Sequence, residues 1–271
     1  MLALALVVAL AAVAYLRPKP DAEDHALSAL APADVKTIRV EPQSAPPIVL
    51  ERAGKAWRMS APVRARADAD RVESLLALLT AKSKHKFAAD DLARFDLDKP
   101  GARVTFNEQT MNFGTVNPLS GEQYVATVGS VFLVAHRLAA AVPRRVQDVI
   151  AKRLFADEEQ PAAFELKQFG VVRRDGKWLT ERAAAAPSQD DYNRWTTDWR
   201  LATALRVEPF AGKATADTIE IGMDDGRRVK LTVLAREPEL QLLRSDEGLR
   251  YDFAAAAAKQ MLAPPAARDA R

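Results

Sequence analysis

The acidic side chains of this chain are the first candidates for chemistry. Asp90 and Asp91 stand near Asp96 and Asp98, around a predicted turn and a helix start. Two carboxylates that act as general acid and general base must face each other across a cleft, about 5–9 Å apart. Spacing along the sequence does not place these four side chains at such a distance, so we assign them no catalytic role.

Other aspartates fall where caps and turns are expected. Asp190, Asp191 and Asp198 belong to the start of a predicted helix, where carboxylates accept backbone N–H bonds and complement the helix dipole. Asp224-Asp225-Gly226 could open a calcium loop, but the spaced ligands and the distal glutamate of such a loop are missing. We interpret this run as the turn of a β-hairpin.

The remaining reactive residue types are scarce. The chain has no cysteine, which excludes disulfides, thiolate catalysis and cysteine-ligated metals. Its three histidines, His25, His85 and His136, stand far apart without metal-ligand spacing. The sequence therefore predicts no catalytic, cofactor-binding or metal-binding residue, and we expect a protein that is not an enzyme and uses no cofactor.

The charge balance argues against nucleic-acid binding. There are 39 basic and 36 acidic residues, for a formal net charge of +3. Nucleic-acid binders concentrate basic residues on one face or helix. The densest basic group here, Arg144-Arg145 with Lys152-Arg153, is typical of the solvated face of a helix.

The first residues form an apolar run. Residues 2–16 are Leu, Ala and Val with one Tyr, followed by Arg17 and Lys19. Three interpretations compete: a membrane anchor, a signal segment cleaved after Ala12-Val-Ala14, and a buried core helix, which should show a polar face and shows none. We favour a single-pass anchor in the inner membrane with the body in the periplasm, although positive charge after the run would by itself favour a cytoplasmic body.

The pattern of predicted elements that positions these side chains occurs twice in the sequence. Residues 48–57 give a strand, a glycine turn and a strand that carries Trp57, and residues 171–178 repeat this order with Trp178. Strand runs and an alanine-rich helical stretch follow in each copy. The pattern predicts an α+β fold of two tandem repeats, each an antiparallel sheet with a packed helix, after an N-terminal membrane helix.

Three helices are central to this prediction. Asp68 or Asp70 caps a helix with Val72, Leu75, Leu76 and Leu79 at helical spacing. Residues 188–191 cap a second helix that carries Trp195, Trp199 and residues 201–205, and residues 146–155 form an amphipathic linker helix. We expect Trp57 and Trp178 to pack into the cores rather than to form a ligand platform.

These predictions divide the chain into six parts. They are an anchor or signal segment (1–17), a tether (18–34), a first α+β repeat (35–142), a linker helix (143–160), a second α+β repeat (161–262) and a tail (263–271).

The order of several short motifs resembles a bacterial family. These motifs are the strand pair from Leu50 to Pro62, the helix start from Ala67 to Leu76, the run from Phe95 to Pro100, and Phe113-Gly114 followed by residues 121–125. Together they are similar to the domain-of-unknown-function 4340 family, most clearly over residues 35–135. The resemblance implies an envelope protein, anchored in the inner membrane and allied to gliding-motility-type ABC transporter components, with no assigned catalytic residues.

Two functions remain open from the sequence. The first is a membrane-anchored extracytoplasmic accessory or scaffold protein that binds a partner in a transporter or envelope complex. The alternative is a periplasmic ligand-binding protein that holds a lipid, glycan or small molecule in a cleft between the two repeats, near residues 146–155.

Overall fold

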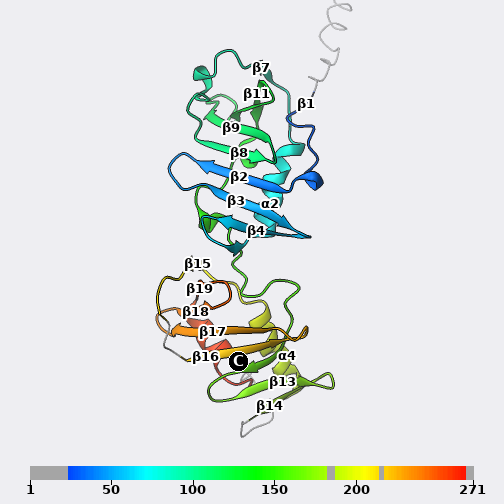
Figure 1. Ribbon diagram of the computed structural model, residues 1–271, viewed down its shortest axis with the longest axis vertical. Coiled ribbons are helices and arrows are strands. Elements are labelled where there is room, and N and C mark those ends of the chain that lie inside the picture. The colour runs from blue at the N-terminus through cyan, green and yellow to red at the C-terminus, as the bar shows by residue number, and fades with distance from the viewer. Residues whose placement is uncertain (1–23, 182–186, 214–216, 267–271) are drawn as a thin grey trace, which may run out of the picture.

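The computed structural model describes residues 24–181, 187–213 and 217–266. Two halves, each built on one large antiparallel sheet, follow one another along the long axis of the molecule (Figure 1). A third, two-stranded sheet lies in the N-terminal half. The predicted α+β class is confirmed.

The N-terminal half contains eleven strands and short helices. Its strands are β1 (His25–Ala26), β2 (Thr37–Pro42), β3 (Ile48–Ala53), β4 (Ala56–Ala61), β5 (Ala65–Arg66), β6 (Lys82–Ser83), β7 (Lys86–Ala88), β8 (Ala102–Phe106), β9 (Gln109–Val116), β10 (Gln123–Thr127) and β11 (Ser130–Val134). Its helices are η1 (Pro32–Asp34), α2 (Ala69–Leu76), η2 (Ala77–Thr80), η3 (Ala93–Phe95) and α3 (His136–Ala139). The large sheet has the order β5-β4-β3-β2-β8-β9-β10-β11-β7.

The C-terminal half follows the short helix η4 (Val146–Asp148). Its strands are β12 (Pro161–Glu165), β13 (Gly170–Arg174), β14 (Lys177–Glu181), β15 (Arg206–Pro209), β16 (Thr218–Met223), β17 (Arg228–Ala235), β18 (Leu240–Arg244) and β19 (Leu249–Phe253), and its helices are α4 (Gln189–Arg200) and α5 (Ala255–Leu262). The sheet order is β14-β13-β12-β16-β17-β18-β19-β15.

The two sheet orders correspond except for β5, which has no counterpart in the C-terminal sheet. Strands β2, β3 and β4 match β12, β13 and β14, and the run β8 to β11 matches β16 to β19. The outermost strands also correspond, because β7 and β15 both lie in the segment between the main helix and the next central strand, and both pair with the last strand of the run.

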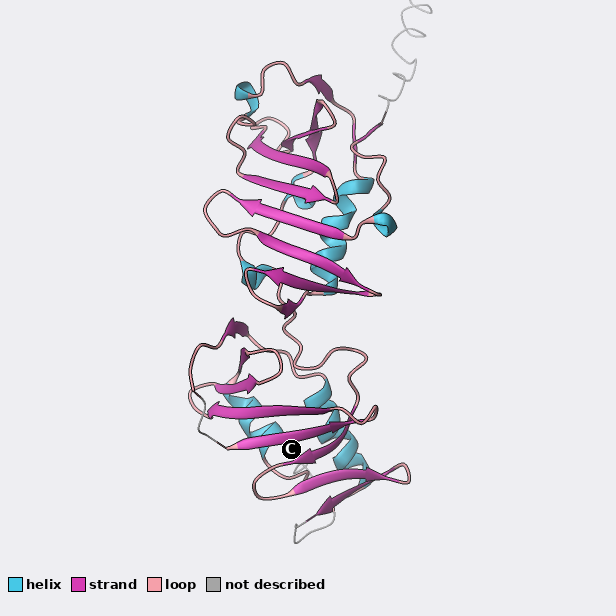
Figure 2. Ribbon diagram, in the orientation of Figure 1, coloured by secondary structure: helices cyan, strands magenta, loops and turns pink. Residues whose placement is uncertain are grey.

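Local sequence signals account for the main helices, which lie against one face of each sheet (Figure 2). The Asp68 side chain accepts a hydrogen bond from the backbone N–H of Arg71 at the start of α2, so Asp68 is the cap and Asp70 is not. Ser188 and Asp191 form a reciprocal capping box at the start of α4. Farther along α4, Trp195 and Trp199 are buried in the core.

The two hairpin tryptophans occupy matching places. Trp57 and Trp178 are each 7% exposed, which confirms their predicted core positions. Each lies directly across the hairpin from an arginine: Arg52 places its guanidinium 4.8 Å from the Trp57 ring centre, and Arg173 lies 5.7 Å from that of Trp178. Both pairs therefore cover the rim of a buried indole with a cation.

A second, smaller core covers the opposite face of the N-terminal sheet. Phe95, Leu97, Ala126 and Val131 form it, with Tyr124 packed 4.5 Å from Phe95 between ring centres. A Cβ added to Gly114 would lie only 2.1 Å from the carbonyl oxygen of Phe95, so glycine is required for this contact. The run Phe95–Pro100 and Phe113-Gly114, singled out in the sequence, thus meet in packing.

The prediction of a linker helix over residues 146–155 is wrong. Only Val146–Asp148 is helical, as a 3-10 turn, and the chain then runs extended between the halves. Val149, Ile150, Leu154 and Phe155 are all buried. An isolated helix would bury one stripe only, whereas hydrogen bonds from both halves to the extended backbone allow all four to be covered.

Two further expectations need correction. Helix α4 ends at Arg200, so residues 201–205 do not continue it as predicted. Leu201 and Leu205 are 50% and 53% exposed, whereas Ala202 and Ala204 are buried. The expected tether of residues 18–34 is not free over its described part, because β1 pairs with β6 and Leu27 is 1% exposed. Apolar Leu27 and Leu30 explain this packing.

The apolar run of residues 2–16, predicted as a membrane helix, lies outside the described residues. Among the helices that are described, none is both long enough and apolar enough to cross a bilayer.

Candidate functional site at the junction of the two halves

The extended linker pairs with both halves through its backbone. Ile150 forms a bridge with Ala67 at the edge of the N-terminal sheet, and Arg153 forms one with Thr203 in the C-terminal half. The bonds around the first bridge join Asp68 N to Val149 O at 2.8 Å and Ala151 N to Arg66 O at 2.9 Å. Leu154 N donates to Ala202 O at 2.9 Å, and Ala204 N to Lys152 O at 2.8 Å. Residues 149–154 thus act as a shared strand, which we call the linker strand.

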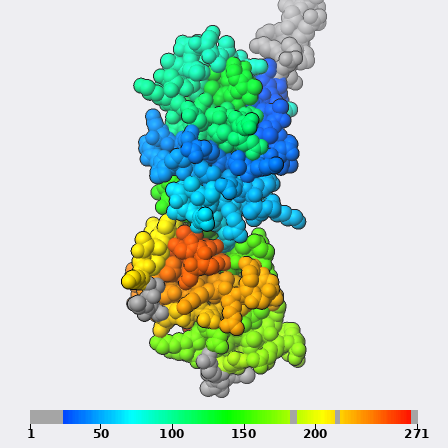
Figure 3. Space-filling model, in the orientation of Figure 1, coloured from blue at the N-terminus to red at the C-terminus, as the bar shows by residue number. Residues whose placement is uncertain are grey.

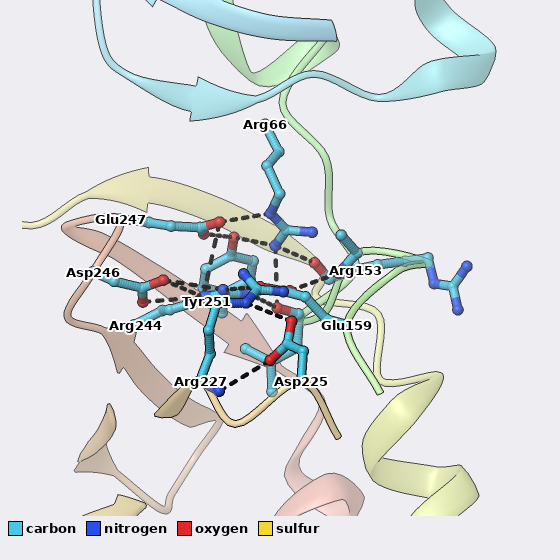
Figure 4. Close-up of polar contacts among 11 residues, drawn as sticks. Arg66, Arg153, Glu159, Asp225, Arg227, Arg244, Asp246, Glu247 and Tyr251 are labelled. Carbon is cyan, nitrogen blue, oxygen red and sulfur yellow. Dashed lines mark hydrogen bonds and ion pairs between the residues drawn. The ribbon is translucent and has the colours of Figure 1, made fainter. Parts of the chain in front are cut away.

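Arg66 crosses from the N-terminal half into the C-terminal half (Figure 4). Its Nε donates to Glu247 Oε1 at 2.6 Å, and its Nη2 donates to the Tyr251 hydroxyl at 3.0 Å. Nη2 also donates to the carbonyl oxygens of Arg153 and Leu154, at 2.8 and 3.1 Å. Burial by itself lowers the pKa of Arg66, but Tyr251 and Glu247 outweigh burial and keep it raised, so the guanidinium is charged.

Arg244 is the buried centre of the same cluster. Its side chain is 3% exposed and bonds Glu159 through both Nη atoms, at 2.8 and 2.5 Å. Nη1 also donates to Leu154 O at 2.7 Å, and the guanidinium lies 5.9 Å from the Phe155 ring centre. Burial opposes the charge, yet the bonds to Glu159 and Asp246 hold the pKa of Arg244 well above its usual value. Such a bidentate pair fixes geometry as well as charge.

Glu159 and Tyr251 are each held in one protonation state. Burial raises the pKa of Glu159, but hydrogen bonds from Arg244 and from the Ala156 backbone outweigh it, and the net shift is downward. Burial and the charge of Glu247 raise the pKa of Tyr251, whose hydroxyl donates to that carboxylate. Tyr251 is therefore a neutral donor rather than a base at physiological pH.

This cluster is saturated with hydrogen bonds. Among the described residues, no buried side-chain nitrogen or oxygen lacks a partner. We call Arg66, Arg244, Glu159, Glu247 and Tyr251 the arginine clasp. Chemically, the clasp can hold two folded bodies in one orientation, and Figure 3 shows the surfaces of the two halves in contact across this junction.

A cleft of about 290 Å³ opens beside the clasp. Trp57 and Phe155 line it together with charged side chains from both sides of the junction. The charged lining residues are Arg58, Arg66, Asp68, Asp70, Lys152, Arg153, Asp157 and Glu158. The cleft therefore mixes apolar surface with charges of both signs, close to the place where the sequence predicted an inter-repeat cleft.

The structure disperses the aspartates considered as candidates in the sequence. Asp91 accepts a hydrogen bond from the backbone of Arg94, and Asp96 ends η3 in the left-handed conformation. Asp224-Asp225-Gly226 forms the turn between β16 and β17, as predicted, and its carboxylates pair with Arg173 and Arg227. Asp190 and Asp191 lie in the first turn of α4, and Asp198 follows on the same helix.

The histidines also lie apart. His25 is in β1, His85 precedes β7 with its ring stacked on Phe87 at 6.4 Å, and His136 begins α3. Within the described residues, no group of three or more His, Cys, Asp or Glu side chains could hold a metal ion. Arg145 joins Asp148 and Arg153 joins Asp157, so the densest basic group is partly paired.

Sequence reasoning missed every member of the arginine clasp. Arg66 and Glu247 are 181 positions apart, and Glu159 and Arg244 are 85 apart. A single sequence contains no signal that pairs charges over such distances.

The comparisons with known proteins give one result. A family model described as "Domain of unknown function (DUF4340)" matches residues 57–222, which is more than half of the chain. The matched segment begins at Trp57 in β4 and ends at Gly222 in β16, so it includes Arg66, the linker strand and Glu159. No curated protein and no solved structure matches. The chain belongs to the DUF4340 family, as the motif order indicated.

Proposed function

We propose that this protein is a membrane-anchored extracytoplasmic accessory protein whose body binds a protein partner in a transporter or envelope complex without catalysing a reaction. The arginine clasp is the observation that carries this proposal. In this cluster Arg66 of the N-terminal half bonds Glu247 and Tyr251 of the C-terminal half, and a fixed orientation of this kind is useful where a binding surface spans both halves.

The body itself supports this proposal through its symmetry. We infer that the halves are tandem repeats of one unit, because the sheet orders, the main helices and the paired Trp57 and Trp178 hairpins correspond. Two fused copies of one unit, without a cluster of reactive groups in their described parts, suit a scaffold better than an enzyme.

The anchor is the second part of the proposal. Residues 2–16 are apolar and Arg17 and Lys19 follow, as in a single-pass segment with charged flanks. The resemblance to envelope proteins supports a periplasmic position for the body. A flotation assay with vesicles tests membrane attachment, and protease protection in spheroplasts tests the side of the membrane.

Partner binding is tested by capture from native membranes. The full chain, tagged and solubilised at native expression level, should bring down a transporter or envelope subunit. Arg66→Met removes the side-chain bonds between the halves and should reduce recovery of that subunit. Arg64→Met, at an exposed position just before β5 and outside the cleft lining, should leave recovery unchanged. Repeated recovery of the wild-type protein alone would reject partner binding.

The cleft supports a second candidate, a ligand-binding protein. The cleft of about 290 Å³ is lined by Trp57, Phe155 and charges of both signs, which suits a small amphipathic or zwitterionic molecule. Native mass spectrometry of the full chain should then show a bound molecule that Ala69→Trp, at the cleft wall, displaces. A single unliganded mass for the wild type, under conditions that retain weak complexes, would remove this candidate.

A further inference from the structure

The end of the N-terminal half that lies farthest from the junction carries a run of lysines. Lys82 lies in β6, Lys84 in the connection and Lys86 in β7, the last strand of the sheet order. All three are exposed, and the side chain of Lys82 retains 64% of its accessible surface. In Figure 1 the labels β1, β7 and β11 gather at this end. We call residues 82–88 the basic end.

This run keeps an excess of positive charge. Within the described part of the chain, neither Lys84 nor Lys86 has an acidic partner at ion-pair distance, and Lys82 has only Asp24 at 3.9 Å. Asp90 and Asp91 come next along the chain, and Asp91 accepts the backbone N–H of Arg94. Unpaired ammonium groups on long, flexible side chains remain available to an anionic surface.

An exposed aromatic ring lies beside the lysines. Phe87, on β7, is 38% exposed. Its ring rests on His85, Phe95 and Tyr124, with centres 6.4, 5.8 and 6.2 Å away. The ring is thus fixed in place with one side open. Aromatic rings and lysines together are the residue types that favour the headgroup layer of a membrane.

The chain enters the body at this same end. The first described element, β1, pairs with β6, so His25 lies opposite Ser83 and Ala26 opposite Lys82. The apolar run of residues 2–16 therefore connects to the body within a few residues of the lysines. If that run lies in a bilayer, the basic end is the part of the body that its connection holds closest to the lipid.

We infer that the basic end is a docking surface for the anionic phospholipids of the membrane that holds the anchor. The inference rests on the proposed anchor for its geometry and adds the surface that orients the body. Anionic headgroups attract each exposed lysine, and this attraction falls off within a Debye length. When β7 contacts the lipid, the long axis of the molecule points away from the bilayer. The C-terminal half then lies farthest from the membrane and is presented to a partner.

The absence of cysteine makes a direct test possible. In the full chain, Ala88→Cys places a single thiol on β7 for an environment-sensitive fluorophore, and Lys177→Cys places one on β14 at the opposite end. The labelled proteins are reconstituted into vesicles of phosphatidylcholine alone or with about 30% phosphatidylglycerol, each containing nitroxide lipids. We expect quenching of the position-88 label to be about twofold stronger in the anionic vesicles and to fall in about 0.5 M salt.

Two triple variants make the test specific. Lys82→Gln, Lys84→Gln and Lys86→Gln together should abolish the difference between the two vesicle types. The matched change of three exposed lysines in the C-terminal half, Lys177→Gln, Lys213→Gln and Lys230→Gln, measured with the position-88 label, should leave it intact. The label at position 177 should not be quenched in either vesicle.

The outcomes separate this inference from the anchor. A protein that floats with both vesicle types but shows equal quenching at position 88 keeps the anchor and overturns the docking surface. A protein that floats only with anionic vesicles, with position 88 quenched, supports the docking surface and rejects the anchor. Quenching at position 177 in place of position 88 would reverse the orientation and overturn the inference.

Discussion

The corresponding strands β4 and β14 carry matching tryptophans, but the two sheets end differently beyond them. In the N-terminal half the chain itself continues the sheet: β5 pairs with β4, and Ala67 N donates to the carbonyl oxygen of Trp57 at 3.0 Å. In the C-terminal half a side chain takes this place. The Gln189 amide accepts the N–H of Trp178 at 3.0 Å and donates to its carbonyl oxygen at 2.9 Å.

The β5 edge of the N-terminal sheet is used to join the two halves, whereas the β14 edge of the C-terminal sheet is capped. Beyond β5 the linker strand follows, and the C-terminal half attaches there. At β14 the carboxamide of Gln189 imitates one peptide group of a neighbouring strand and satisfies the edge without extending it. Exposed strand edges invite pairing with other chains, so a side-chain plug at this end limits further stacking.

The largest expected effect comes from removing either tryptophan. Trp57→Ala and Trp178→Ala should each lower the free energy of unfolding by about 3–5 kcal/mol, because each empties a core site. Hydrogen exchange followed by mass spectrometry should show the loss of protection mainly in the half that holds the substitution. Equal loss in both halves from either variant would show that the two cores behave as a single cooperative unit.

The next effect concerns the clasp. Arg66→Met removes charged hydrogen bonds between the halves and should cost about 2–3 kcal/mol of coupling. Urea unfolding measured by the exchange protection of each half should then separate into two transitions. Arg64→Met, at an exposed position just before β5, is the matched control and should keep the wild-type profile. Coincident transitions in Arg66→Met would indicate that the linker strand alone couples the halves.

Acid should weaken the clasp by a smaller amount. The folded-state pKa of Glu159 is lowered, so its stabilising contribution is complete above its unfolded value of about 4.3 and is lost as pH falls through the folded value. Urea midpoints should therefore fall below about pH 4 more steeply in the wild type than in Glu159→Gln. Glu158→Gln, at the exposed neighbouring position, should follow the wild type. Parallel curves for wild type and Glu159→Gln would contradict this assignment.

The smallest effect on stability concerns the plug at β14. Gln189→Ala should cost about 1 kcal/mol, since it removes two neutral hydrogen bonds, but it also frees an edge strand. Sedimentation should show association that increases with concentration. Asn193→Ala, on the exposed face of the same helix, should remain at the wild-type association state. A monomeric Gln189→Ala would show that the edge is protected by something other than this amide.

Features set by neighbouring residues, such as helix caps and hairpin turns, could be predicted from the sequence. Asp68 and Ser188 cap helices, glycine turns precede Trp57 and Trp178, and the α+β class follows from hairpins without alternating helices. The linker was mispredicted because Val149, Ile150, Leu154 and Phe155 have helical spacing in part, while the deciding hydrogen bonds come from Arg66, Asp68 and Ala202, far away in sequence. The clasp depends wholly on such remote contacts, and no pattern in one sequence reveals them.

The position of Arg66 also affects how the protein can be made. Its side-chain partners in the C-terminal half, Glu247 and Tyr251, leave the ribosome long after β5 is complete. Every described strand of the N-terminal half lies before residue 135, so this half can fold during synthesis while Arg66 stays hydrated. Hydration costs little for a guanidinium on the surface. The C-terminal half, in contrast, folds after Arg66 has been positioned by the N-terminal half. We therefore expect the junction to close last, so that the finished first half serves as a template for the orientation of the second.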